Sequence, residues 1–230
     1  MSTTQREEPP MAVVLKLTTS ASRTAITARV VISLKAEMIV CLPSDTCYGL
    51  SCLATSQTVT AKLAQIKNRS ASKPFILITH NVQMARHYVK VWSTEAQAIA
   101  GAFWPGPITI ILPFSQHQAC PIAHNSNTIA VRVPGSAILR EIIRTVGCPL
   151  WSTSANDPGR PCATSIRAVP VHLQEHIELM LDVGKLPGQE PSTVIDLSKR
   201  TPTILREGPI KAKDIISRTN IQLLNDDVDR

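Results

Sequence analysis

Short apolar runs alternate with helical stretches along most of the chain, and this alternation limits the fold more than any other feature. Apolar runs bounded by turn residues predict buried strands. Expected strands lie at 38–42, 50–54, 74–79, 108–112, 128–133, 148–152, 179–183, 193–197 and 203–205. Helical patterns lie at 19–35, 58–67, from 81, at 93–103, at 136–146 and from 164. The sequence therefore predicts one α/β domain with a twisted open mixed sheet flanked by helices.

Length and composition are consistent with one compact domain. The chain has 230 residues, 43% of them hydrophobic, which is enough for a sizeable core. We expect a polar tail at 1–17, a folded domain at 18–215 and a second tail at 216–230. There is no run of 18 apolar residues and no apolar signal segment, so no membrane partner and a cytoplasmic location are expected. Six cysteines without CxxC spacing predict reduced thiols.

Positive charge is concentrated in one segment. Residues 46–140 hold eight Lys or Arg and one Glu, whereas the rest of the chain holds 16 basic and 16 acidic residues. Such a segment attracts a polyanion such as ATP or RNA, and the alternative is a solvated basic face without a partner. Aromatic residues make up only 3%, which argues against a stacking platform for single-stranded nucleic acid.

A polar loop, STSANDPGRPCAT at 152–164, follows one of the expected strands. Ser152 and Ser154 offer hydroxyl donors, and Asn156 can close the loop on itself. Gly159 lets backbone N–H groups approach an anion closely. A nucleotide phosphate is the expected ligand. The alternative is an ordinary serine-rich turn, because the segment matches no phosphate fingerprint such as the Walker pattern.

A second polar loop, PSDTCYGL, joins two expected strands at 43–50. Asp45, Thr46 and Tyr48 place a carboxylate, a hydroxyl and a phenol within four positions, as on the rim of a binding site. An Asx turn that satisfies its own backbone explains the same residues equally well.

Three basic residues, Lys67, Arg69 and Lys73, follow an expected helix in the segment KNRSASKP. Cations near a helix C-terminus are stabilised by the helix dipole, so a purely structural explanation exists. Three cations within seven residues are more than that explanation needs, and they suit the binding of phosphate groups.

Arg132 lies inside the apolar strand TIAVRV. A buried charge needs a partner. The guanidinium can grip a ligand carboxylate through two parallel hydrogen bonds. The alternative is an internal salt bridge to Asp45, Asp182 or Asp196.

The string HLQEH, at 172–176, matches the inverted zincin pattern H-x-x-E-H, in which two histidines bind zinc. The match rests on three residue types that are common on solvated helix faces. A zinc site is therefore the weaker interpretation, and no metal ligand is predicted among the protein side chains.

Seven segments together resemble the YrdC-like threonylcarbamoyl-AMP synthase family. They are PSDTCYGL, KNRSASKPF, WPGPIT, TIAVRVP, STSANDPGRP, PSTVIDLS and ILREG, in the family's order, and they span 43–208. The resemblance implies condensation of L-threonine, bicarbonate and ATP to threonylcarbamoyl-AMP and pyrophosphate, for modification of tRNA. It implies ATP as a substrate, Mg²⁺ bridging phosphate oxygens, and a threonylcarbamoyl-transferase complex as downstream partner.

The resemblance also assigns residues. Lys67 and Arg69 are the expected catalytic residues, because the chemistry needs charge neutralisation and positioning and no protein nucleophile. Nucleotide binding is expected from Lys67, Arg69, Thr128, Ser152, Ser154, Asn156, Cys162 and Arg206. Threonine binding is expected from Thr46, Tyr48, Lys73, Arg132 and Ser192, with Arg132 on the threonine carboxylate.

The sequence departs from the family pattern at several points. Cys47 replaces an apolar β-branched residue, and Cys162 stands where some members have a nucleotide-binding Ser. Lys73 occupies a position that varies in the family. The segment DVGKLPG, at 182–188, lacks a double glycine often found after its aspartate. The chain ends soon after ILREG, so the extra C-terminal domain of longer members is not expected.

Two other interpretations remain open at this point. One is a module that binds tRNA or double-stranded RNA without catalysis, in which case binding is electrostatic and weakens steeply with salt. The other is a related domain of carbamoyl-transfer proteins that mature hydrogenases. Against it, the sequence has no zinc-finger cysteine pairs and no second catalytic domain.

Overall fold

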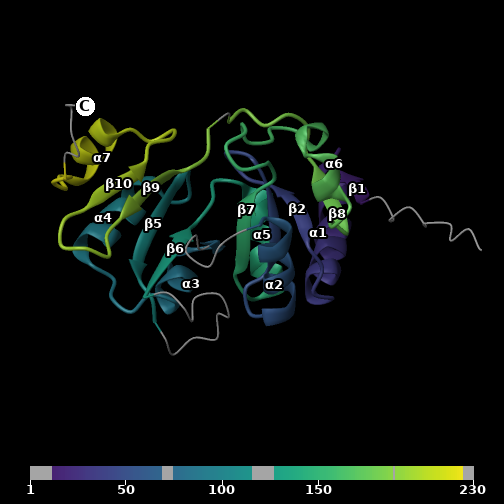
Figure 1. Ribbon diagram of the computed structural model, residues 1–230, viewed down its shortest axis with the longest axis horizontal. Helices are drawn as coiled ribbons and strands as arrows, with labels where there is room; N and C mark the ends of the chain where they lie inside the picture. Colours follow the sequence, from purple (N-terminus) through teal and green to yellow (C-terminus); the bar gives the residue numbers. More distant parts are fainter. Residues whose placement is uncertain (1–11, 69–74, 116–126, 189, 225–230) are drawn as a thin grey trace, which may run out of the picture.

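The computed structural model describes residues 12–68, 75–115, 127–188 and 190–224, which form an open ten-stranded sheet with helices around it (Figure 1). The strands are β1 (Val13–Lys16), β2 (Val40–Pro43), β3 (Tyr48–Leu53), β4 (Ile76–Ile78), β5 (Ile108–Pro113), β6 (Thr128–Arg132), β7 (Leu150–Ser154), β8 (Leu179–Asp182), β9 (Thr193–Asp196) and β10 (Thr203–Arg206). The helices are α1 (Ser20–Lys35), α2 (Gln57–Ile66), α3 (Val82–His87), α4 (Thr94–Phe103), α5 (Ala137–Val146), the 3₁₀ turn η2 (Ile166–Ala168), α6 (Val171–Gln174) and α7 (Ala212–Thr219).

The sheet is mixed, with the order β1-β8-β2-β3-β7-β4-β6-β5-β9-β10. Four neighbouring pairs in the described sheet are parallel. They are β1 with β8, β8 with β2, β4 with β6, and β5 with β9. The other neighbouring pairs are antiparallel. The predicted α/β domain with an open mixed sheet is therefore confirmed.

Side chains alternate between two cores on the two faces of the sheet. In β2, Val40 and Leu42 pack with α1 and α5, whereas Cys41 points into the opposite core. That second core also receives apolar residues of α2, α3, α4 and α7. This period-two pattern is what a strand buried on both faces requires.

Polar caps fix the starts of the helices. Thr19, Asn81, Ser93 and Ser136 each accept a hydrogen bond from the backbone N–H three residues on, so the helix starts expected at 19, 81, 93 and 136 are confirmed. In α5 the buried residues recur at helical spacing, and the helix ends at Gly147, whose φ of 86° is the left-handed conformation that glycine tolerates.

The structure corrects the sequence reasoning at both ends of the domain. Residues 13–16, expected within a polar tail, form the edge strand β1 and pair in parallel with β8. Helix α7 runs past the expected boundary at 215 and packs against α4. The domain therefore extends further in both directions than 18–215.

Two expectations around the serine-rich loop were wrong. Thr153 and Ser154 were expected in a loop but form the end of β7, where Ser154 pairs with Gly49. The helix expected from Thr164 is broken into η2 and the short α6, because Pro170 lacks a backbone N–H and stands between them.

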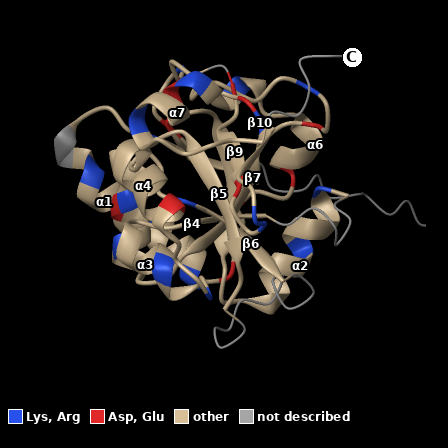
Figure 2. Ribbon diagram, turned by 90° about the vertical axis from the view of Figure 1, so that its left-hand side faces the viewer, with Lys and Arg blue, Asp and Glu red and all other residues tan. Residues whose placement is uncertain are grey.

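Lys, Arg, Asp and Glu residues lie mainly on the helices and loops, while few of them lie in the strands of the central sheet (Figure 2). None of the helices in the described parts of the chain is long and apolar enough to cross a membrane.

Candidate functional site

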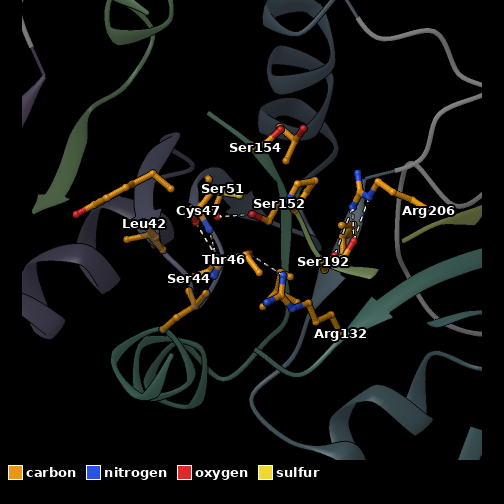
Figure 3. A pocket seen from close by; sticks show the side chains of 17 residues that line it. Leu42, Ser44, Thr46, Cys47, Ser51, Arg132, Ser152, Ser154, Ser192 and Arg206 are labelled. Atoms are coloured by element: carbon orange, nitrogen blue, oxygen red, sulfur yellow. Dashed lines mark hydrogen bonds between the residues drawn. The ribbon is translucent and has the colours of Figure 1, made fainter. Parts of the chain in front are cut away.

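A small polar cavity of about 110 Å³, here called the narrow cavity, lies on the face of the sheet that α5 covers (Figure 3). The turn between β2 and β3, the end of β6, strand β7 and the residue before β9 all contribute to it. Its polar lining includes Ser44, Thr46, Ser51, Arg132, Ser152 and Ser192, and its apolar lining includes Leu42, Ile78 and Leu139.

Arg132 is the buried cation of the narrow cavity and is only 4% exposed. Its Nη2 donates to Asp45 Oδ1 over 2.7 Å, and its Nη1 donates to Thr46 Oγ1 over 3.1 Å. Its Nε donates to the carbonyl of Gly106 over 3.0 Å, so the WPGPIT segment also holds the guanidinium. The salt bridge to Asp45, one of the three partners considered from the sequence, is therefore present.

These contacts do not use up the hydrogen-bonding capacity of Arg132. A guanidinium carries five N–H donors. Among the described residues, three of these N–H groups donate to Asp45, Thr46 and Gly106. Two N–H groups therefore remain for a ligand. A salt bridge and a grip on a ligand carboxylate are compatible at this residue.

The turn before Thr46 is closed by Ser44 rather than by an Asx turn at Asp45. Ser44 Oγ accepts hydrogen bonds from the backbone N–H groups of Thr46 and Cys47, both over 3.1 Å. Ser44 Oγ also lies 2.9 Å from Thr46 Oγ1. The Asx-turn interpretation was wrong, and the Asp45 carboxylate forms a salt bridge with Arg132 instead.

Tyr48 lines the narrow cavity, but its hydroxyl is tied to the backbone. The hydroxyl donates to the carbonyl of Gly184 over 2.7 Å and accepts from the N–H of Val183 over 3.1 Å. Burial raises the pKa of Tyr48 to about 12, so the phenol is neutral over the physiological range. Tyr48 therefore connects the 182–188 segment to the cavity wall.

Ser192 lies on the far side of the narrow cavity, 2% exposed. Its hydroxyl lies 2.8 Å from Thr109 Oγ1, and its carbonyl accepts two hydrogen bonds from Arg206, over 3.0 and 2.9 Å. A Cβ at Gly208 would lie 2.3 Å from the carbonyl of Pro191, so only glycine lets the ILREG segment approach so closely.

A larger cavity of about 540 Å³, here called the wide cavity, opens beside the narrow one. Its wall is the segment from Asn156 to Cys162, with Lys67, Glu190 and Arg206 around it. Thr153, Ser154, Pro191 and Arg206 line both cavities, so the two cavities adjoin at these residues.

Lys67 and Asn156 hold the wall of the wide cavity. Lys67 Nζ donates to the carbonyls of Ser154, over 3.0 Å, and Asn156. Asn156 Nδ2 donates to the carbonyl of Arg160 over 2.5 Å and so closes the loop, as its sequence position predicts. Partial burial lowers the pKa of Arg206, and the nearby Arg132 cation acts in the same direction.

The structure places most of the predicted site residues around these two cavities. Arg69 and Lys73 lie outside the described residues. Thr128 lies at the opposite end of β6 from Arg132 and lines a separate cavity of about 400 Å³ with Lys90 and Ser198. The structure does not bring Thr128 to the narrow or the wide cavity.

The zinc interpretation of HLQEH receives no support. His172, Glu175 and His176 are exposed, and His172 Nε2 lies 3.1 Å from Asp157 Oδ1. Over the described ranges, His, Cys, Asp and Glu side chains form no group of three or more that would hold a metal ion.

Sequence reasoning missed three hydroxyl residues of the narrow cavity and its wall. Ser51 donates to Ser152 Oγ over 3.0 Å, Ser44 closes the turn, and Thr109 contacts Ser192. Two of them could have been found from the sequence, because Ser51 and Thr109 are polar residues at inward positions of apolar strands.

Comparison with known proteins adds the family. A family model described as telomere recombination, and named for Sua5, YciO and YrdC, matches residues 33–208. A threonylcarbamoyl-AMP synthase of Pyrococcus abyssi (strain GE5 / Orsay) is 32% identical over 177 residues, which is 77% of this chain and 52% of the relative. A threonylcarbamoyl-AMP synthase of Vibrio vulnificus (strain YJ016) is 30% identical over 184 residues, which is 78% of this chain and 97% of the relative.

A solved structure agrees with these relatives. The crystal structure of P. abyssi Sua5 complexed with L-threonine matches with a TM-score of 0.83 and 28% identity, over 93% of this chain and 62% of that chain. The chain thus spans about half the length of the Pyrococcus relative and nearly all of the Vibrio relative. Because the family model covers most of the chain and the fold agrees, this protein belongs to the Sua5/YciO/YrdC family.

Proposed function

We propose that the protein condenses L-threonine, bicarbonate and ATP to threonylcarbamoyl-AMP and pyrophosphate. The observation that carries this proposal is the junction of the two cavities. A narrow cavity with a buried guanidinium adjoins a wide cavity bordered by Lys67 and Arg206. The names of the relatives, and the threonine in a related structure, support the same assignment.

Threonine is the proposed ligand of the narrow cavity. Its carboxylate takes the two remaining N–H groups of Arg132, and its hydroxyl and amine face the hydroxyls of Thr46 and Ser192. Its methyl group contacts the apolar wall formed by Leu42, Ile78 and Leu139. A site that pairs each polar group of its ligand rejects analogues that lack one.

The nucleotide is the proposed ligand of the wide cavity. Lys67 and Arg206 supply positive charge for the triphosphate, and Ser154 lies where the cavities meet. Asn156 keeps the 156–162 wall in shape, and Cys162 belongs to that wall. Ser152 sits at the narrow-cavity side of the same strand, where the reacting ends of the two substrates converge.

The proposed reaction needs no protein nucleophile. The threonine amine adds to the carbon of bicarbonate and water leaves, which gives a carbamate. A carbamate oxygen then attacks the α-phosphorus of ATP, a P–O bond forms, and the bond to pyrophosphate breaks. The protein holds the two substrates in line at the junction and offsets the charge that builds up on the phosphates. This chemistry is that of a nucleotidyltransferase.

Magnesium fits this site as a companion of the nucleotide. Mg²⁺ prefers oxygen ligands and is often held by one or two carboxylates plus substrate phosphates. The wide cavity offers two carboxylates, and each already contacts a side chain, Asp157 that of His172 and Glu190 that of Lys211. Either carboxylate would hold the ion, and the ion would neutralise charge on the phosphate oxygens.

The proposed product serves tRNA modification in the cytoplasm, with a threonylcarbamoyl-transferase complex as the next partner. The main competing proposal is a module that binds tRNA or double-stranded RNA without catalysis. It predicts salt-sensitive RNA binding and no turnover of ATP.

Pyrophosphate release by the purified chain tests the proposal. With ATP and magnesium, release should require threonine and bicarbonate together and should need no tRNA. Omitting either co-substrate, or replacing threonine with threoninol, is the matched control. Absence of release with all substrates present would rule out the synthase activity, and release with ATP alone would rule out threonine as the acceptor.

A further inference from the structure

The short segment between β6 and α5 is held by hydrogen bonds at three successive carbonyls. The backbone N–H of Gly106 donates to the carbonyl of Val133 over 2.9 Å. The half-buried Arg140, on α5, donates through Nη1 to the carbonyls of Pro134 and Gly135, over 2.6 and 2.8 Å. Because these donors come from different parts of the fold, the backbone of the segment is fixed from two sides.

Gly135 packs against the carboxylate of Asp45, in the turn between β2 and β3. A Cβ at Gly135 would lie 2.8 Å from Asp45 Oδ2 and 3.0 Å from Asp45 Cγ, so only glycine allows so close an approach. The other carboxylate oxygen, Oδ1, accepts from Arg132 over 2.7 Å. The Asp45 carboxylate therefore lies between the backbone of Gly135 and the guanidinium of Arg132.

The environment of Asp45 Oδ2 shows that packing contributes to this arrangement as well as hydrogen bonding. Oδ2 is buried and has no hydrogen-bond partner in the described part of the chain. A buried acceptor without a partner costs free energy. An unhindered carboxylate would turn this oxygen toward water, and the contact with Gly135, together with the bond to Arg132, opposes that turn.

We infer that Gly135 and Arg140 are positioning residues for the threonine substrate. Arg140 fixes the backbone at Gly135. Gly135 in turn holds the Asp45 carboxylate against Arg132, whose guanidinium is the group proposed to bind the threonine carboxylate. Neither Gly135 nor Arg140 lines the narrow or the wide cavity, so both act through other residues. This positioning role rests on the proposed function of the narrow cavity.

The direction of the guanidinium decides how well it binds a carboxylate. Two parallel hydrogen bonds form only when the planar guanidinium and the carboxylate lie in one plane. Thr46 and Gly106 also accept from Arg132, so loss of the Asp45 contact should tilt the guanidinium rather than release it. Outer contacts of this kind keep a binding group within the geometry that its ligand needs. Threonine affinity should therefore depend on residues that threonine does not touch.

Gly135→Ala tests the contact with Asp45. Alanine suits the backbone at this position, because the φ of Gly135 lies outside the left-handed region. The added methyl group meets the end of the Asp45 side chain, which can turn away, so the variant should fold. Calorimetric titration should show a threonine affinity about tenfold lower, and an ATP affinity within about twofold of wild type. Gly101→Ala, in α4, where a Cβ would meet nothing within 4 Å, is the matched control.

Arg140→Met tests the hold on the segment and provides the answer if Gly135→Ala does not fold. It removes both hydrogen bonds to the segment carbonyls. Threonine affinity should fall by about fivefold, and Arg140→Lys, whose ammonium can donate to both carbonyls, should recover most of it. Arg144→Ala, one helical turn further along α5, should leave threonine affinity unchanged. Unchanged threonine affinity in folded Arg140→Met, or an equal loss of affinity for threonine and ATP, would overturn the inference.

A double-mutant cycle tests whether Gly135 acts through Asp45. In an Asp45→Ala background, the carboxylate that the added methyl group would displace is absent. Gly135→Ala should then change threonine affinity by less than about twofold, against about tenfold in the wild-type background. The same factor in both backgrounds would mean that Gly135 only supports the fold, and the positioning role would be wrong. In pyrophosphate release by the single variant Gly135→Ala, the KM for threonine should rise while kcat stays within about twofold of wild type.

The positioning role and the proposed function fail separately. If the wild type binds threonine and both variants weaken that binding, but no pyrophosphate is released, the synthase proposal fails and the positioning role stands. If pyrophosphate is released in the presence of threonine and bicarbonate, but both variants keep the wild-type affinity and KM for threonine, the positioning role fails and the synthase proposal stands. If the wild type binds no threonine, both fail.

Discussion

The narrow and wide cavities are adjacent but are built in different ways. In the narrow cavity, the polar side chains are buried and bond to one another as well as to backbone: Thr46, Arg132 and Ser192 are each at most 4% exposed, and the Arg132 guanidinium donates to Thr46 Oγ1 and to the carbonyl of Gly106. In the wide cavity, side chains hold backbone: Lys67 and Asn156 donate to carbonyls of the loop that forms its wall.

This difference suits the two kinds of ligand that the proposed function requires. A small amino acid needs a rigid, desolvated site that matches each polar group. A triphosphate needs accessible cations and a loop that adapts to it. Substitutions in the two cavities should therefore affect different ligands, and the narrow cavity should tolerate change less.

Replacement of Arg132 should have the largest effect. Arg132→Ala removes the proposed carboxylate ligand, so threonine affinity should fall by about 100-fold or more, while ATP affinity changes by less than about threefold. Calorimetric titration with each ligand separately measures both. The exposed Arg144, on α5, provides the matched control as Arg144→Ala.

Folding must be monitored in this experiment, because Arg132→Ala leaves Asp45 without its cation. Loss of one partner of a buried pair costs about 3–5 kcal/mol, and partial exposure of Asp45 reduces that figure. The double variant Asp45→Asn with Arg132→Met removes both charges and should fold better than the single variant. If the folded double variant lost affinity for threonine and for ATP equally, Arg132 would not bind threonine specifically.

Lys67→Gln should weaken the binding of ATP rather than that of threonine. The loss of a charged hydrogen-bond donor costs about 1.5–3 kcal/mol, so ATP affinity should fall by about 10- to 150-fold while threonine affinity stays nearly constant. Lys62→Gln, on the exposed face of the same helix α2, is the control. Unchanged ATP affinity would remove Lys67 from the nucleotide site.

The buried thiols and the buried phenol of the central sheet should affect the alkaline stability of the protein. Burial raises the pKa values of Cys41 and Cys47 from 9.0 to about 12 and that of Tyr48 from 10.0 to about 12. In the unfolded chain these groups lose their protons from about pH 9 upward, whereas the folded protein retains them until about pH 12. Their contribution to stability is therefore complete below pH 9 and is lost as the pH rises to 12.

Urea unfolding at pH 8 and pH 10.5 measures this effect. The free energy of unfolding should fall by about 1.4 kcal/mol per pH unit for each group that is ionised only in the unfolded chain. Cys52, in β3, adds a further group of the same kind. Cys41→Ala should flatten the profile, and a flat profile in wild type would show that these buried groups are accessible to water.

Asn156→Ala should have the smallest effect. The side chain closes the wall of the wide cavity through one hydrogen bond, worth about 0.5–1.5 kcal/mol. ATP affinity should fall by about 2- to 12-fold, and threonine affinity should not change. A larger change for threonine than for ATP would reverse the assignment of this loop.

Whether an element depends on local or on long-range contacts explains which elements could be predicted from the sequence. Strands and helices with strong periodicity, such as α5, were predicted because apolar spacing and polar caps act locally. Strand β1 was missed because its four residues are stabilised by pairing with β8, a contact across more than 160 residues. Thr153 and Ser154 continue β7 because β3 lies beside them.

The site was predictable where a residue type conflicts with its surroundings. Arg132 stood out as a charge in an apolar strand, but only the fold selects Asp45 as its partner over Asp182 and Asp196. Asp182 accepts from the N–H of Gly184, and Asp196 accepts from Ser198. The wide cavity was less predictable, since its wall is a loop whose shape depends on Lys67, 87 residues away from Ser154.

A crystal structure with L-threonine and a non-hydrolysable ATP analogue tests the division between the cavities most directly. The threonine carboxylate should lie within about 3 Å of the Arg132 guanidinium in the narrow cavity, with the triphosphate in the wide cavity beside Lys67 and Arg206. Threonine bound outside the narrow cavity, or a triphosphate in contact with Arg132 in its place, would contradict the proposed division.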